Sequence, residues 1–98
     1  MTEIRRIYIT GGPGSGKSTL ATKISETTGF PVFEIDWLLW TDPETGERVS
    51  KEERKQVTSD IAEKPTWIVD GINVGWAQKI WSDADLVIFM NISLKQTL

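Results

Sequence analysis

A glycine-rich stretch near the N-terminus has the residue types and spacing of a phosphate-binding loop. Residues 11–18 read Gly-Gly-Pro-Gly-Ser-Gly-Lys-Ser and fit the pattern G-x-x-x-x-G-K-[ST]. Glycines let the backbone curl until successive N–H groups point at phosphate oxygens, and a helix N-terminus adds a positive dipole end. A nucleoside triphosphate is the expected ligand. The alternative, a glycine-rich turn without a ligand, is disfavoured by the complete motif.

The pattern also predicts what the polar residues of this loop do. We expect Lys17 to reach the β- and γ-phosphates and the Ser18 hydroxyl to ligate Mg²⁺. ATP and Mg²⁺ are therefore the expected cofactors. The register G-x-G-x-x-G of a dinucleotide fingerprint is absent. The expected nucleotide-binding residues are Gly11, Gly12, Pro13, Gly14, Ser15, Gly16, Lys17, Ser18 and Thr19.

Two carboxylates follow later apolar runs. Asp36 comes after residues 31–35, and Asp70 comes after residues 67–69. Ligands gather at the carboxyl ends of parallel strands. Asp70 suits a magnesium ligand of the Walker B kind, with Gly71 allowing a sharp turn. Asp36 could orient an acceptor hydroxyl or accept its proton. Either aspartate could instead cap a helix or form a turn.

These assignments give a compact set of candidate site residues. The expected catalytic residues are Lys17, Asp36 and Asp70, and the expected metal ligands are Ser18 and Asp70. Arg54 is the best candidate for a substrate contact among the basic residues of the central segment, where a solvated helix face is the alternative. Core packing is the expected role of most tryptophans, with base stacking left open at the first two: Trp37, Trp40, Trp67, Trp76 and Trp81.

The elements that must position these residues alternate between short apolar runs and helical stretches. We expect strands at residues 4–10, 31–35, 67–69 and 86–91. Helices are expected from the glycine-rich stretch to about residue 28, from 51 to about 63, and over 74–81. Ser50 with Glu53 forms a capping box for the second helix, and Gly29 ends the first. This alternation predicts an α/β fold with a parallel sheet in one domain.

The last residues predict an incomplete domain. Ser93 with Gln96 forms another capping box, but the sequence stops at Leu98, before two helical turns can form. We therefore expect a domain over residues 1–98 that is truncated at its C-terminus. A frayed tail is the alternative. Truncation would leave the fourth strand at an exposed edge, which is open to self-association.

Composition excludes several classes of protein. Among 98 residues, Lys and Arg number 11 and Asp and Glu number 14, a formal charge of −3 that disfavours nucleic-acid binding. Without Cys or His, the chain has no disulfide, Cys/His zinc site, thiol nucleophile or histidine relay. No apolar run approaches the roughly 20 residues of a membrane helix. We expect a cytoplasmic protein that does not contact membranes.

The strand, loop and helix start of residues 7–19 resemble the adenylate kinase group of P-loop nucleoside and nucleotide kinases. Residues 34–40, 67–71 and 84–90 are similar, more specifically, to the adenylate-kinase-like DNA topology modulation proteins. The resemblance implies a three-layer P-loop NTPase fold with strand order 2-3-1-4, whose fifth strand and arginine-bearing lid are missing here. It also implies a substrate-binding segment over residues 37–66. Adenylate kinases follow the third-strand Asp-Gly with Phe-Pro-Arg, whereas Ile72, Asn73 and Val74 stand here, which disfavours AMP as acceptor.

These features predict a P-loop protein that binds ATP and Mg²⁺. It would be an adenylate-kinase-like phosphotransferase, or the N-terminal fragment of one, with a small-molecule phosphate acceptor that the sequence does not identify. The alternative is a non-catalytic nucleotide-binding or interaction module. A DNA-binding factor is a third class, which the acidic charge balance does not support.

Overall fold

The computed structural model describes residues 3–12, 14–36, 49–71 and 78–90. Strands and helices alternate along these residues, as the sequence predicted. In chain order they are β1 (Arg6–Gly11), α1 (Lys17–Thr28), β2 (Val32–Glu34), α2 (Lys51–Ala62), β3 (Trp67–Asp70), α3 (Gln78–Asp83) and β4 (Leu86–Met90).

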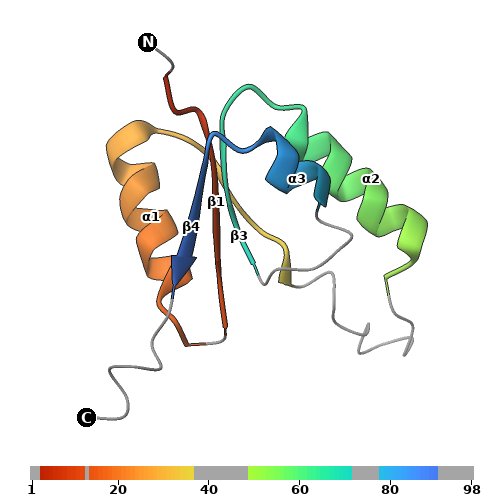
Figure 1. Ribbon diagram of the computed structural model, residues 1–98, viewed down its shortest axis with the longest axis horizontal. Coiled ribbons are helices and arrows are strands. Elements are labelled where there is room, and N and C mark those ends of the chain that lie inside the picture. Colours follow the sequence, from red (N-terminus) through yellow and green to blue (C-terminus); the bar gives the residue numbers. More distant parts are fainter. Residues whose placement is uncertain (1–2, 13, 37–48, 72–77, 91–98) are drawn as a thin grey trace.

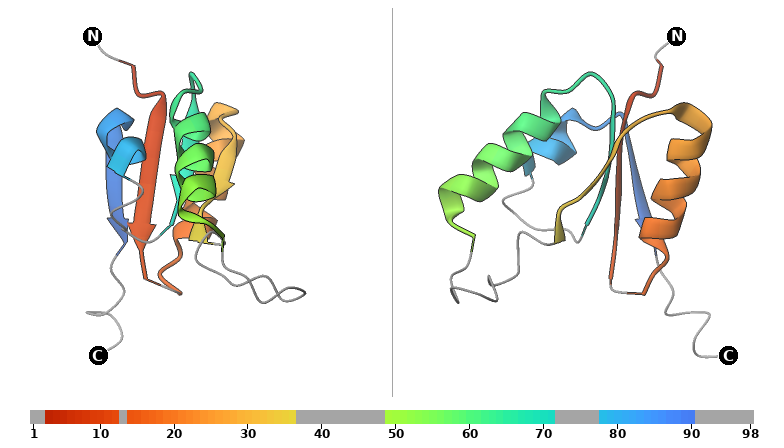
Figure 2. Two further views of the ribbon diagram at one scale, coloured as in Figure 1. Left: turned by 90° about the vertical axis from the view of Figure 1, so that its right-hand side faces the viewer. Right: turned by 180° about the vertical axis from the view of Figure 1, so that it is seen from behind.

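The strands form one parallel sheet in the order β2-β3-β1-β4. Helix α1 covers one face of this sheet, and α2 and α3 cover the other (Figure 1). Seen from behind, the turn that leads from β1 into α1 lies at the end of the sheet where β4 ends (Figure 2). The three-layer α/β fold and the predicted strand order are confirmed.

Side chains that alternate along the strands build a core on each face. Ile7 and Ile9 of β1 and Ile68 of β3 pack with Ala21 of α1. Residues of opposite parity pack beneath α2 and α3. The buried members of that second cluster are Tyr8, Ile35, Ile61, Ala62, Trp67, Val69 and Ile80. Because successive side chains of a strand point to opposite faces, every central strand contributes to both cores.

Local signals place the helix ends as predicted. The Glu53 N–H donates to Ser50 Oγ at 3.0 Å, which caps the N-terminus of α2. Gly29, at φ 80°, ends α1, and its N–H donates to the Ser25 carbonyl at 2.7 Å. That left-handed conformation favours glycine.

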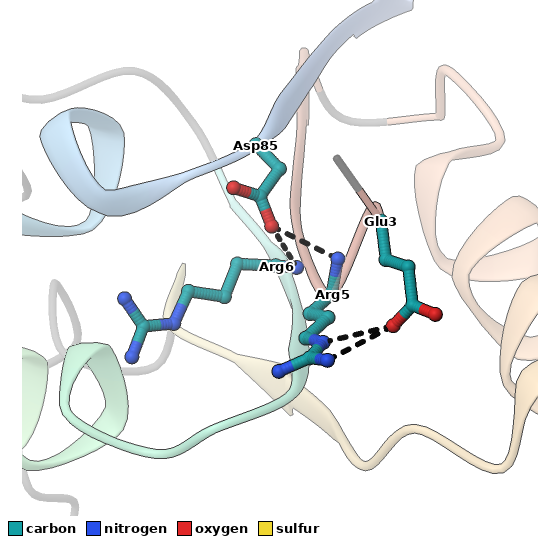
Figure 3. A network of polar contacts seen from close by, with 4 residues as sticks. All are labelled: Glu3, Arg5, Arg6 and Asp85. Atoms are coloured by element: carbon teal, nitrogen blue, oxygen red, sulfur yellow. Dashed lines mark hydrogen bonds and ion pairs between the residues drawn. The ribbon is translucent and has the colours of Figure 1, made fainter. Parts of the chain in front are cut away.

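The end of the sheet that lies away from the glycine-rich loop is held by Asp85 (Figure 3). Its Oδ2 accepts hydrogen bonds from the backbone N–H groups of Arg5 and Arg6, at 2.9 and 3.1 Å. The sequence predicted that the first strand begins at Ile4, but β1 begins at Arg6 and Ile4 is half exposed. A side chain from the start of β4 thus meets N–H groups at the start of β1.

Two of the tryptophans lie in the described core. Trp67 is fully buried, and Trp81 packs edge-on against Tyr8 with ring centroids 5.6 Å apart, so core packing is confirmed for both. Helix α3 continues to Asp83, beyond the predicted end at residue 81, and Lys79 pairs with Asp83 at 3.1 Å. The other tryptophans, the predicted start of this helix and the last capping box lie outside the described residues.

None of the helices in the described part of the chain combines the length and apolar character needed to cross a membrane.

Candidate nucleotide-binding site

The glycine-rich loop adopts conformations that require glycine. Gly14 and Gly16 have φ of 75° and 90°, in the left-handed region. The Ser15 N–H donates to the Gly12 carbonyl at 3.2 Å and tightens the turn. Gly16 stands at the N-cap of α1, where no side chain caps the helix among the described residues. The first N–H groups of α1 are thus suited to an anion rather than to a capping side chain.

The hydroxyl of Ser15 is also suited to an anionic ligand. Ser15 is 7% exposed, and its Oγ has no hydrogen-bond partner in the described structure. A buried hydroxyl without a partner costs about 1–3 kcal/mol, and a phosphate oxygen would accept its hydrogen bond. A Cβ at Gly11 would lie 2.8 Å from this Oγ and 2.8 Å from the Met90 carbonyl, so only glycine fits there.

Ser18 lies between two carboxylates at the carboxyl ends of neighbouring strands. Its Oγ is 3.1 Å from Asp70 Oδ2 and 3.2 Å from Glu34 Oε1. Glu34 and Asp70 are register partners in β2 and β3. Two positions before each of them stands an apolar residue that packs in the core beneath α1. Side chains two positions apart on a strand point to the same face, so both carboxylates point toward α1. These oxygens are of the kind that Mg²⁺ prefers.

Glu34 is the site residue that sequence reasoning missed. Its position could have identified it, because Glu34 ends the second strand and stands two positions before Asp36. The described residues contain no group of three or more acidic side chains arranged to hold a metal ion by themselves. A Mg²⁺ ion here would take oxygens from Ser18, from one or two carboxylates, and from phosphate and water.

The structure brings Lys17 and Asp36 together. Lys17 Nζ lies 3.2 Å from Asp36 Oδ2, with the two side chains 9% and 30% exposed. Lys17 is the first residue of α1, and Asp36 follows the end of β2. The sequence predicted both residues as functional but not this ion pair.

Asp70 is an unusual carboxyl because it is 2% exposed at the end of a buried strand. Burial raises its pKa above the ordinary aspartate value, and the Ser18 hydroxyl opposes this rise by hydrogen bonding to the charged form. The negative charge of Glu34 raises the pKa further, Lys17 lowers it, and Asp36 raises it. Ionisation of Asp70 therefore costs more free energy in the folded protein than in the unfolded chain.

Gly71 packs closely against the segment that follows β2, a role that the sequence did not predict. Its φ is not positive, and it is buried against the segment that follows β2. A Cβ at Gly71 would overlap Ile35 Cγ1 and lie 3.2 Å from Asp36 Oδ1. Glycine is needed here for close packing beside Asp36, and the sharp turn predicted after Asp70 involves residues outside the described ones.

Gly71→Ala is expected to destabilise the fold by about 1–3 kcal/mol, because the new methyl must displace Ile35. Urea unfolding followed by circular dichroism measures this difference. Gly12→Ala is the matched control, since a Cβ there meets nothing within 4 Å, and its stability should stay within about 0.5 kcal/mol of wild type. Equal stabilities for the two variants would contradict the packing argument.

The remaining predicted residues are not all at this site. Thr19 is exposed in the first turn of α1, and Pro13 lies outside the described residues. Arg54 Nε donates to the Val49 carbonyl at 3.3 Å. Apart from the loop, a cleft of about 890 Å³ lies between α2 and α3, and the residues that line it include Lys51, Lys55, Gln56, Ser59, Gln78 and Lys79.

A family described as an AAA domain matches residues 6–88, which include the glycine-rich loop, the strands β1, β2 and β3, and the start of β4. The chain belongs to this AAA domain family. The AAA domain chain is also 33% identical over 86 residues to the uncharacterized protein YqaC of Bacillus subtilis (strain 168). That match covers 88% of the chain and 48% of YqaC, so the chain spans about half the length of this curated relative.

Solved kinase structures share the fold of this AAA domain chain. Shikimate kinase from Acinetobacter baumannii, in complex with shikimate, superposes with a TM-score of 0.68 at 15% identity, covering 96% of this chain and 61% of the kinase. Shikimate kinase from Aquifex aeolicus vf5 gives 0.64 at 22% identity, with 88% and 63% covered. A gluconokinase from Sinorhizobium meliloti 1021 gives 0.53 at 24% identity, with 92% and 60% covered. The chain has the P-loop kinase fold.

Proposed function

We propose that this chain binds a nucleoside triphosphate with Mg²⁺ and forms the nucleotide-binding part of a phosphotransferase. The observation that carries the proposal is the position of Ser18, whose hydroxyl lies between Asp70 and Glu34 at the start of α1. The left-handed glycines before it and the buried Lys17 beside it complete a loop suited to phosphates.

Each residue of this site then has a task in phosphoryl transfer. The loop N–H groups and the Ser15 hydroxyl bind phosphate oxygens, and Lys17 stabilises the charge on the transferring group. Ser18 and Asp70 would hold Mg²⁺, with Glu34 beside Ser18, and the ion would supply positive charge against the phosphates. Asp36 orients the acceptor hydroxyl or accepts its proton as the acceptor oxygen bonds to the γ-phosphorus and ADP leaves.

The acceptor is proposed to bind on the side of α2, within residues 37–66. The cleft between α2 and α3 supports this position, and three lysines and Glu52 are among the residues that line it. Shikimate and the substrate of the gluconokinase are ligands of the structural neighbours, and they do not identify the acceptor of this chain. The resemblance to adenylate-kinase-like DNA topology modulation proteins rests on sequence motifs. Three statements stay predictions from the sequence. They are a single kinase-like domain without its lid, self-association through the β4 edge, and a cytoplasmic location.

Isothermal titration with ADP and Mg²⁺ tests the proposal. We expect saturable binding of one nucleotide, weakened by EDTA, and stabilisation against unfolding by about 2.7 kcal/mol at a hundredfold excess of ADP over Kd. Absence of binding at millimolar nucleotide would overturn it. ADP release from ATP in the presence of phosphorylated, carboxylated or neutral acceptors then distinguishes a transferase from the alternative, a nucleotide-binding module without catalysis.

A further inference from the structure

The candidate site holds one described lysine among several carboxylates. Lys17 faces Asp36 directly, at 3.2 Å, whereas Glu34 and Asp70 contact Ser18. Lys17 is 9% exposed, so its ammonium group has little water to replace a missing counter-charge. A buried cation that loses its partner carries a large desolvation cost. Lys17 therefore needs either Asp36 or another anion.

We infer that Asp36 and the nucleotide phosphates compete for Lys17, so that nucleotide binding opens the ion pair between Lys17 and Asp36. The inference rests on the proposed function and concerns regulation of the same site. A triphosphate brings several negative charges to Lys17, and these repel Asp36 while they attract the lysine. Asp36 is 30% exposed, so its carboxylate can gain water or an acceptor hydroxyl when the ion pair opens.

This competition links the two substrates. While Lys17 is paired, its ammonium is directed to Asp36 and does not bind phosphate. The apparent nucleotide affinity is then the intrinsic affinity multiplied by the fraction of molecules in which Lys17 is available. Once nucleotide is bound, the contact between Lys17 and Asp36 is lost. By linkage, an acceptor that draws Asp36 away from Lys17 must strengthen nucleotide binding by the same factor by which the nucleotide strengthens binding of that acceptor.

The test compares ADP affinity among variants in EDTA, so that no divalent cation contributes. Asp36→Asn keeps the size of the side chain and removes the competing charge, and we expect it to bind ADP about 3- to 10-fold more tightly than wild type. Glu26→Gln is the matched control. It removes one negative charge from an exposed position on α1, the helix that Lys17 begins. Its affinity should change by less than about 2-fold.

The outcomes separate the two claims. If the wild-type chain fails to bind ADP, the proposed function falls first. If wild type binds but Asp36→Asn binds equally or more weakly, the competition is refuted and the proposed function stands. An equal gain in Glu26→Gln would also refute it, since the loss of one negative charge anywhere on the chain would then explain the effect. Asp36→Ala provides a second variant if the asparagine form does not fold.

Discussion

Lys17→Ala is expected to weaken ADP binding by at least about 100-fold. Lys17 is buried at the start of α1, where its ammonium would meet the β-phosphate in a site with little water. Hydrogen bonds to charged groups contribute about 1.5–3 kcal/mol each, and two powers of ten in affinity correspond to about 2.7 kcal/mol. The loss should be present with and without Mg²⁺, because Lys17 acts on the phosphates directly.

Isothermal titration measures this loss, with Lys23→Ala as the control. Lys23 lies on the same helix but is exposed, so its removal should change ADP affinity by less than about 2-fold. Circular dichroism of both variants shows whether α1 remains folded. A folded Lys17→Ala variant that binds ADP within 3-fold of wild type would contradict the role assigned to this lysine.

Asp70→Asn is expected to change binding and stability in opposite directions. Without the carboxylate, the gain in ADP affinity that Mg²⁺ provides should fall by about 10- to 100-fold, a range typical when a group that supports a metal is removed. The fold should nevertheless become more stable near neutral pH, by about 1 kcal/mol, as is common where a functional group is buried at a cost. Asparagine can still accept the Ser18 hydrogen bond and does not repel Glu34.

The pH dependence of this gain follows from the raised pKa of Asp70. Folding favours the protonated carboxyl, so its contribution to stability is fully present below the ordinary aspartate pKa and is lost as the pH rises through the raised value. The stability difference between Asp70→Asn and wild type should therefore be small in acid and grow toward neutral pH.

Urea unfolding at several pH values measures that difference. Asp60→Asn on the exposed face of α2 serves as the control and should show a difference within about 0.5 kcal/mol. A stability difference for Asp70→Asn that stays constant with pH would contradict the burial argument.

Local features of the sequence predicted most of the fold. The N-cap at Ser50 and the stop at Gly29 depend on neighbouring residues, so both helix ends could be derived without tertiary information. Strand order came from resemblance to a kinase family rather than from composition or periodicity. The start of β1 was misplaced because Asp85, about 80 residues away, holds the N–H groups before it.

The sequence pointed to most of the residues that meet in the candidate site, but not to Glu34 and not to the contacts among them. Ser18 and Asp70 were expected to meet because a motif and a strand end each have a known place in a parallel sheet. Glu34 was missed because its approach to Ser18 depends on the register of β2 against β3. The ion pair of Lys17 with Asp36 depends on how the chain leaves β2, and the packing of Gly71 beside Ile35 depends on the same segment.

The central position of β1 also affects how the protein can form during synthesis. This first strand pairs with β3 on one side and β4 on the other, so both partners are made after it. The base of the glycine-rich loop is completed only by the last strand, because Gly11 packs against Met90. At ribosomal rates of about 5–20 residues per second, roughly 4–16 seconds separate these residues. Until then, the apolar strand β1 lacks at least one of the two strands that pair with it.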